Sequence, residues 1–207
     1  VLSHERVCPH IHLCLQSGSD SVLRRMRRRW SVKTFLNRCE MLRSRLDRPA
    51  ITTDIILGFP GESDAEFEQT KRTAAEAGFS KIHIFPFSPR RGTPAAEMTD
   101  QIPKPVKSAR GQELGALEQT LRRAYFQSLV GRPLELLGER LEERQNGPVV
   151  RGTSCRYAPV EAPGEASDLG RLKVVVPDAA DAEGLYVDLP QAAACDNHNA
   201  APGRRRQ

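Results

Sequence analysis

Polar and aromatic side chains gather at three places along this 207-residue chain where a predicted strand ends. The first place is the segment Gln16-Ser17-Gly18-Ser19-Asp20, which offers an amide, hydroxyls and a carboxylate around a glycine. Such groups can bind the polar part of a small molecule. They are equally typical of a capped helix start, so this segment alone leaves both interpretations open.

The second place is the end of an apolar strand that carries Asp54 in its middle. An unpaired carboxylate is costly inside such a strand, so we expect Asp54 to point into a cavity or to bond to a partner. Gly58 and Gly61 follow where the strand gives way to a loop, and they allow another group to approach the backbone closely. In α/β folds, ligands bind at this carboxyl end of the strands.

The third place is the segment of residues 85–93, Phe-Pro-Phe-Ser-Pro-Arg-Arg-Gly-Thr, at the end of another strand. It is either a rigid connection with two solvated arginines or an adenine or anion site lined by aromatic rings and backbone groups. The residues themselves favour neither interpretation.

Residues 24–30 contain five arginines next to Trp30. Most charge runs are solvated helix faces, but the uniform sign and the adjacent aromatic ring also suit contact with phosphate groups. His10 and His12 alternate along a strand and therefore share a face. Because no third ligand is near them in the sequence, we expect packing and hydrogen bonding from this pair and assign no metal ligand.

The elements that position these segments follow a strand–helix alternation. Residues 7–15 predict a strand, Val22, Leu23, Met26 and Trp30 recur at helical spacing, and residues 35–46 predict a second helix. The apolar run Ile55-Ile56-Leu57 predicts a strand covered on both faces. Ser63 and Glu66 then form a capping box, Gly78 ends the helix, and residues 80–87 predict the next strand. This order indicates repeated βα units with parallel pairing.

Near Gly131 the sequence changes from helical spacing of apolar residues to short strand candidates separated by Gly, Pro and Asp clusters. This change predicts a domain boundary, so that residues 1–130 form one domain and residues 131–190 another. A long helix over residues 106–130 closes the first domain. Short strands expected at residues 134–141, 149–157, 172–176 and 185–189 indicate a small β-barrel. Residues 191–207 are polar, end in three arginines, and are expected to be a disordered basic tail.

The composition of the chain argues against a membrane protein, a secreted protein and a disulfide-stabilised scaffold. With 39% hydrophobic and 28% charged residues, no long apolar run and no signal peptide, the chain is expected to be cytoplasmic, with no membrane partner. Its five cysteines lack the spacing of a disulfide scaffold or a self-contained metal site. The net charge of +5 is compatible with a polyanionic partner.

Taken together, the three strand ends make the chain resemble the radical S-adenosylmethionine (SAM) methylthiotransferases over residues 7–190. The matching segments are residues 12–19, 53–62 and 85–95, in the order of the family. The form of residues 85–88 after residues 78–80 is most similar to the branch that acts on transfer RNA. This branch adds a methylthio group to C2 of N6-threonylcarbamoyladenosine at position 37, next to the anticodon.

The resemblance implies an α/β fold: the C-terminal half of a TIM-like radical-SAM barrel, followed by a small all-β, OB-like TRAM domain that binds RNA. It implies SAM and two 4Fe-4S clusters in the full-length enzyme, and tRNA as the partner. The residues expected at SAM are Gln16, Ser17, Asp54, Ile55, Phe85, Pro86 and Phe87. Those expected at RNA are Arg27, Arg28, Arg90 and Arg91.

The chain also departs from the family. Cys14 stands where proline is usual, Trp30 and Phe87 where tyrosine is common, and Arg91 where proline is frequent. The C-x-x-x-C-x-x-C cluster motif is missing, so no cluster is expected on these cysteines and no catalytic residue is identifiable. Since the chain starts with Val1, we expect a fragment that begins about halfway around the barrel, is inactive alone, and needs the missing N-terminal half of the same protein.

Two other interpretations stay open at this point. One is a non-catalytic TRAM-type RNA-binding protein that keeps a decayed barrel. The other is an unrelated βα-barrel enzyme with Asp54 and Glu62 as acid and base, which requires both carboxylates to converge on a substrate. Glu62 is better placed to begin a helix, where the dipole favours a negative charge.

Overall fold

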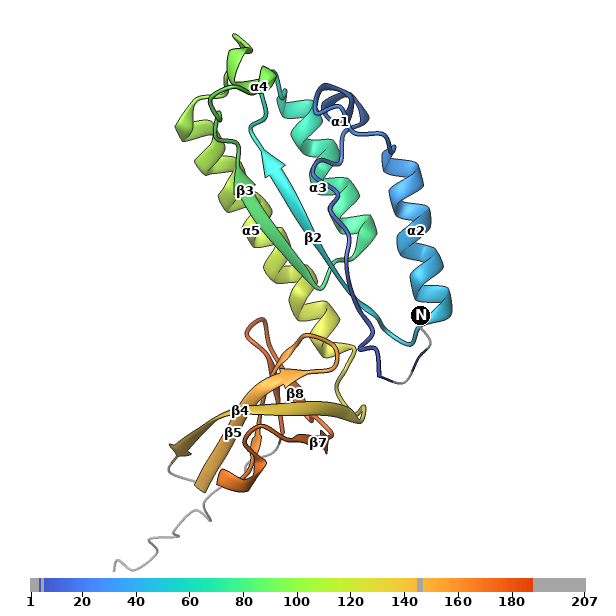
Figure 1. The fold of residues 1–207 in the computed structure, drawn as a ribbon, viewed down its shortest axis with the longest axis vertical. Coiled ribbons are helices and arrows are strands. Elements are labelled where there is room, and N and C mark those ends of the chain that lie inside the picture. The colour runs from blue at the N-terminus through green and yellow to red at the C-terminus, as the bar shows by residue number, and fades with distance from the viewer. Residues whose placement is uncertain (1–3, 5, 145–146, 188–207) are drawn as a thin grey trace, which may run out of the picture.

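The structure is a computed structural model that describes residue 4 and residues 6–144 and 147–187. Residues 6–127 form an α/β half, called the barrel half below, and residues 134–187 form a β-domain (Figure 1). The tail expected over residues 191–207 lies outside the described residues. Within the described residues, no helix combines the length and apolar character needed to cross a membrane.

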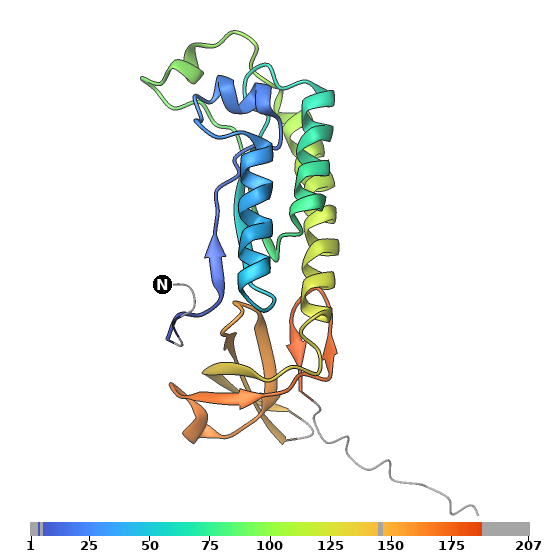
Figure 2. The ribbon, with the colours of Figure 1, turned by 90° about the vertical axis from the view of Figure 1, so that its right-hand side faces the viewer.

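Three parallel strands make the sheet of the barrel half, in the order β1 (His10–His12), β2 (Ala50–Leu57) and β3 (Lys81–Pro86). Three long helices lie together on one face of this sheet (Figures 1 and 2). They are α2 (Val32–Arg45), α3 (Asp64–Ala77) and α5 (Lys104–Gln127). The predicted βα alternation and parallel pairing are confirmed, and the curled sheet fits part of a barrel.

Alternation along β2 separates a buried layer from an open face. Ile55 and Leu57 are at most 1% exposed and pack with α2, α3 and α5 in one apolar cluster. Asp54 and Ile56 point to the opposite face and are only half-buried. The prediction that both faces of the strand are covered is therefore wrong at its carboxyl end, because the described helices cover only one side.

The residues at the helix ends explain where the helices begin and stop. Ser63 and Glu66 form the predicted capping box at the start of α3, and Gly78 adopts the left-handed conformation that ends it, with φ 57°. The first helix, α1, spans only Asp20–Arg25, which is shorter than the apolar spacing suggested. Arg27 has a φ of 57° just after it, and this left-handed residue prevents the helix from continuing to Trp30. A single-turn helix, α4 (Pro94–Glu97), precedes α5.

The β-domain is a six-stranded sheet in the order β7-β4-β5-β6-β9-β8. Its strands are β4 (Leu134–Arg144), β5 (Gly147–Ser154), β6 (Pro159–Pro163), β7 (Leu172–Val175), β8 (Ala179–Ala180) and β9 (Leu185–Tyr186), with a short 3-10 helix at Ala166–Asp168. Leu134, Leu136, Val160 and Leu185 meet in its core, which the end of α5 also joins through Phe126. The sequence did not predict β6, because prolines occupy both of its ends.

Side chains from both parts meet at the amino end of the parallel sheet. His10 of β1 stacks on Tyr157 of the β-domain, with ring centroids 4.2 Å apart and planes 7° from parallel. The hydroxyl of Tyr125 on α5 donates to the carbonyl of Arg48 at 3.0 Å. These contacts leave the opposite, carboxyl end of the sheet free of the β-domain (Figure 1).

Candidate ligand site at the carboxyl end of the parallel sheet

A cavity of about 410 Å³ opens at the carboxyl end of the parallel sheet. Its volume falls within the range of about 300–1,000 Å³ that small-molecule sites occupy. The walls come from all three of the segments that the sequence singles out. The lining residues are Gln16, Asp54, Ile56, Phe85, Pro86, Phe87, Ser88, Arg90, Thr93 and Ala95.

Gln16 is held in the cavity wall by its own backbone. Its N–H donates to the carbonyl of Asp54 at 2.8 Å, and its carbonyl accepts from the N–H of Ile56 at 2.8 Å. These bonds form a parallel bridge to β2 beyond the end of β1. Gln16 adopts a φ of 70°, which is uncommon for a residue with a side chain and is held here by both bonds.

The loop after Gln16 is built against α3. A Cβ on Gly18 would lie 2.6 Å from Cα of Thr70 and 2.7 Å from Cβ of Thr73, so only glycine fits. The N–H of Gly18 donates to Oγ1 of Thr70 at 3.1 Å, and Oγ1 of Thr73 donates to its carbonyl at 3.0 Å. The close approach expected at Gly58 and Gly61 is confirmed as well, because a Cβ at these positions would overlap the side chains of Lys107 and Asp100.

Ser17 and Ile55 do not line the cavity. The Ser17 side chain is fully buried beside α3, where its hydroxyl lies 3.3 Å from Oγ1 of Thr70. Ile55 is fully buried in the apolar layer under the helices, and its neighbour Ile56 takes the place in the wall. The other five residues expected at SAM, which are Gln16, Asp54, Phe85, Pro86 and Phe87, are brought together there.

Asp54 both faces the cavity and has partners. Its Oδ1 lies 3.4 Å from Nε2 of His12, and its Oδ2 accepts from Sγ of Cys14 at 3.7 Å. Burial, followed by the Asp54 charge, raises the pKa of the Cys14 thiol, so the thiol is protonated at neutral pH. The half-buried carboxylate thus belongs to a group of polar side chains on the open face of the sheet.

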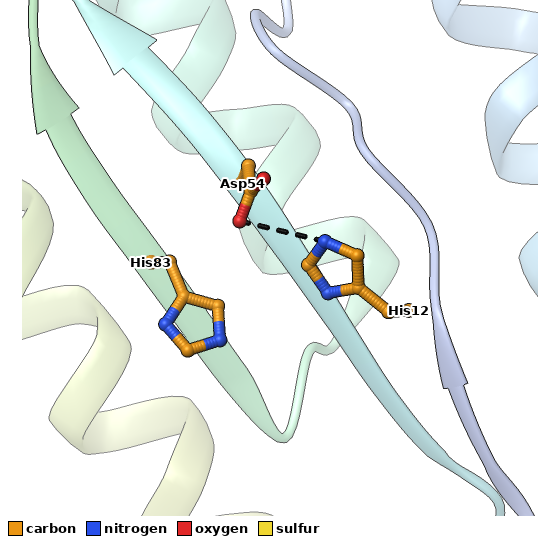
Figure 3. Close-up of side chains that lie close together, drawn as sticks. All are labelled: His12, Asp54 and His83. Atoms are coloured by element: carbon orange, nitrogen blue, oxygen red, sulfur yellow. Dashed lines mark ion pairs between the residues drawn. The ribbon is translucent and has the colours of Figure 1, made fainter.

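His83 extends this group. The packing and hydrogen bonding expected of His10 and His12 are confirmed by the bonds to Thr52 and the stacking on Tyr157, and His83 is a further potential metal ligand that is near His12 in space but not in the sequence. His83 stands directly beside Asp54 in the register of β2 and β3. One ligand atom each from His12, Asp54 and His83 lies within 4.8 Å of the others (Figure 3). The sequence carries no local signal for this cluster, because residues 12, 54 and 83 are distant in the chain and meet only through strand pairing.

Glu62 is bonded inside the turn and does not face the cavity. Its side chain is 1% exposed, and Oε2 accepts from the N–H of Gly58 at 2.7 Å and from Nη1 of Arg110 at 2.7 Å. Burial raises the pKa of Glu62 against the opposing effect of these two donors. Glu62 and Asp54 therefore do not converge, which removes the geometric basis for the acid–base interpretation. Arg110, buried on α5, has no distinguishing signal in the sequence.

The arginines of residues 24–30 have different environments. Arg25 is bound by both oxygens of Glu66, at 2.9 and 2.8 Å, and this pairing lowers the pKa of Glu66 to about 2. Arg27 and Arg28 line a second cavity of about 240 Å³ that shares Ile56, Phe87, Thr93 and Ala95 with the first. Arg90 lines the first cavity, whereas Arg91 is exposed and lines neither. Three of the four arginines expected at RNA thus lie around the same end of the sheet.

The profile of the radical SAM superfamily matches residues 2–74. The chain is 42% identical over 200 residues to the tRNA-2-methylthio-N(6)-dimethylallyladenosine synthase 1 of Mycobacterium marinum, a match over 95% of this chain and 36% of the relative. It is 36% identical over 169 residues to the threonylcarbamoyladenosine tRNA methylthiotransferase of Bacillus subtilis, over 81% of this chain and 38% of the relative. The chain belongs to the radical SAM methylthiotransferase family.

The chain spans little more than a third of the length of the curated relatives it matches. The radical SAM family implies SAM and 4Fe-4S clusters in full-length relatives. The cluster does not fit the residues described here: Cys39 is buried in α2, Cys155 lies in the β-domain, and no three thiols of the described residues gather. The cavity fits SAM better, because aromatic, amide and charged groups converge on one space.

Proposed function

We propose that this chain is the C-terminal part of a tRNA methylthiotransferase, and that its cavity at the carboxyl end of the sheet is one wall of the SAM site. The observation that carries the proposal is the convergence of Gln16, Asp54, Phe85 and Arg90 on a space of about 410 Å³. These residues come from three separate segments, each of which matches the family pattern. A ligand with one flat apolar part and several polar groups suits such a lining.

Each wall suits a different part of SAM. Phe85, Pro86 and Phe87 offer an apolar surface for the adenine ring, and Phe87 packs edge-on against Phe59 with centroids 5.2 Å apart. Gln16 and Asp54 offer polar groups for hydroxyls or the ammonium group, and Arg90 offers a cation for the carboxylate. When bound, SAM supplies the radical and the methyl group. The residues of this chain bind and orient it.

The remaining parts of the enzyme are proposed to lie elsewhere in the same protein. The cluster-binding thiolates would face this cavity from the missing half of the barrel, where the open face of β2 and β3 points. The β-domain is proposed to be a TRAM domain that binds tRNA. On this account the chain alone is inactive, because it lacks the three thiolates that a cluster needs.

We propose N6-threonylcarbamoyladenosine at position 37 as the substrate nucleoside, in line with the form of residues 78–88. The M. marinum relative and one from Corynebacterium diphtheriae, 42% identical over 147 residues, are named for dimethylallyladenosine, which makes that nucleoside the second candidate. The two modified adenosines differ in charge, since only the threonylcarbamoyl group carries a carboxylate. Arg27 and Arg28 beside the cavity would complement that carboxylate.

Arg27 and Arg28 provide a test of tRNA binding with the chain itself. The double variant Arg27→Glu/Arg28→Glu should bind unmodified tRNA at least about tenfold more weakly at low salt, because two cations become anions at the proposed phosphate-binding surface. The slope of log affinity against log salt should also fall by about 2. Filter binding over a series of salt concentrations measures both effects.

Arg38→Glu is the control for that experiment, because Arg38 is an exposed arginine on α2 and lines neither cavity. Arg38→Glu should weaken tRNA binding only by the small amount that follows from the lower net positive charge of the chain. Equal losses in the control and the double variant would show that residues 27 and 28 have no special role, and would count against the proposed tRNA surface.

A further inference from the structure

The open face of the parallel sheet carries three potential metal ligands within one small space, and the thiol of Cys14 lies beside them. His12 comes from β1, Cys14 from the loop after it, Asp54 from β2 and His83 from β3. Nε2 of His12 lies 3.4 Å from Oδ1 of Asp54 and 3.3 Å from Sγ of Cys14. Sγ of Cys14 lies 3.7 Å from Oδ2 of Asp54, and Figure 3 shows the ring of His83 on the other side of Asp54.

The distances from Nε2 of His12 to Asp54 and to Cys14 are those of ligands around a tetrahedral ion. A zinc ion about 2.1 Å from nitrogen and oxygen ligands and about 2.3 Å from a thiolate separates the ligand atoms by about 3.4 to 3.6 Å. The distances from Nε2 of His12 to Oδ1 of Asp54 and to Sγ of Cys14 lie close to these values. Cys14 contacts Asp54 through the other carboxylate oxygen, Oδ2, so its thiol would have to turn toward Oδ1 to complete the site. The ligand atom of His83 is within 4.8 Å of those of His12 and Asp54, which a change in its side-chain torsion can shorten because the residue is exposed.

A buried threonine orients the first histidine. Oγ1 of Thr52 lies 2.9 Å from Nδ1 of His12 and 3.2 Å from Nε2 of His10. The two bonds are satisfied together when Nδ1–H of His12 donates to the hydroxyl and the hydroxyl donates to His10. This arrangement leaves the lone pair of Nε2 on His12 directed at the space between Asp54 and Cys14, as in metal sites whose histidines are fixed by an outer hydrogen bond.

We propose that His12, Asp54, His83 and Cys14 bind a divalent transition metal ion of the zinc type. Two imidazoles, a carboxylate and a thiolate suit zinc, and they do not suit magnesium or calcium, which prefer oxygen ligands alone. The thiol of Cys14 would lose its proton to water when the ion binds, and the resulting thiolate and the carboxylate together neutralise the charge of the ion. The site would tie β1, which has only three residues, to β2 and β3.

This site is separate from the iron–sulfur chemistry of the family and does not depend on the proposed function. It uses no C-x-x-x-C-x-x-C motif, and its one thiol stands at a position where the family usually has proline. Asp54 belongs both to the metal site and to the wall of the cavity, so an ion would fix the orientation of that carboxylate.

Cobalt(II) titration of the untagged 207-residue chain tests the proposal. We expect visible absorption bands of tetrahedral cobalt that saturate at one ion per chain and disappear when zinc is added. A near-ultraviolet thiolate-to-cobalt band should accompany them. Asp54→Asn and His83→Asn should each weaken cobalt binding at least about tenfold. Cys14→Ser should keep the visible bands in altered form and lose the thiolate band.

Cys8→Ser is the matched control, because Cys8 is an exposed thiol outside the cluster, and it should change neither signal. Circular dichroism establishes that each variant is folded. If His83→Asn does not fold, the thiolate band in folded Cys14→Ser decides: its loss supports the site and its persistence contradicts it. Absence of saturable cobalt bands in the parent chain, or unchanged binding by folded Asp54→Asn, would overturn the proposal.

Discussion

Replacement of Arg110 by methionine is expected to destabilise the barrel half by about 3–5 kcal/mol. Arg110 is 5% exposed, and its guanidinium donates to the carboxylate of Glu62 at 2.7 Å and to the Glu62 carbonyl at 3.1 Å. Without it, Glu62 remains buried, and among the described residues the N–H of Gly58 is the hydrogen-bond donor left to it. Urea unfolding followed by the fluorescence of Trp30, the single tryptophan, measures the change in the barrel half.

Two further variants separate this ion pair from general effects of losing a cation. Glu62→Gln/Arg110→Met should cost less than the sum of its two single changes, because no uncompensated charge stays buried. Lys71→Met removes pairs with Glu68 and Glu113 at the surface and should cost no more than about 1 kcal/mol. A cost below about 1 kcal/mol for Arg110→Met would show that the turn at Gly58 does not depend on the pair.

Gly18→Ala is expected to cost about 2–4 kcal/mol and to disturb the cavity as well. The new methyl group would lie 2.6 Å from Cα of Thr70, and backbone cannot move aside as a flexible side chain does. The loop must move away from α3, which weakens its hydrogen bonds to Thr70 and Thr73. Gln16, two residues earlier in the cavity wall, would be displaced with it. The same unfolding experiment measures the stability loss.

Gly115→Ala is the control for this prediction. Gly115 lies within α5, and a Cβ there meets no atom within 4 Å. Because alanine favours a helix over glycine, the change should stabilise the chain by about 0.5–1 kcal/mol. A neutral Gly18→Ala variant would mean that the loop is not packed on α3 as described, and would remove the account of how Gln16 is positioned.

Features of the barrel half that depend on neighbouring residues, such as helix caps, are predictable from the sequence. Contacts between residues that are distant in the chain are not. Ser63 and Glu66 act within one helical turn, so their capping box was readable from the residues alone. Arg110 and Glu62 are separated by 48 residues, and nothing in the polar start of α5 distinguishes Arg110 from an exposed arginine. The β6 strand was missed because proline at Pro159 and Pro163 weakens the strand signal, although the strand pairs on both sides.

In the candidate site, too, the local features are predictable from the sequence and the long-range contacts are not. The pattern of apolar residues placed Asp54 in a strand, and the cost of burying its charge predicted that it has a partner or faces a cavity. The register of the strands decides which residue becomes that partner. His83 lies beside Asp54 because of the pairing of β2 with β3, which no short sequence pattern encodes. The prediction that Ser17 and Ile55 line the site is wrong, because alternation along β2 turns Ile55 to the helix layer and Ser17 lies in the loop that packs on α3.

Nucleoside analysis of tRNA by mass spectrometry, from cells before and after disruption of the gene that encodes this chain, tests the proposed methylthiolation. We expect that 2-methylthio-N6-threonylcarbamoyladenosine disappears, that its unmethylthiolated form accumulates, and that the intact gene restores the first pattern. Loss of the methylthio form of dimethylallyladenosine would instead assign the second substrate. Unchanged levels of both methylthio nucleosides would contradict the account and favour a non-catalytic RNA-binding protein.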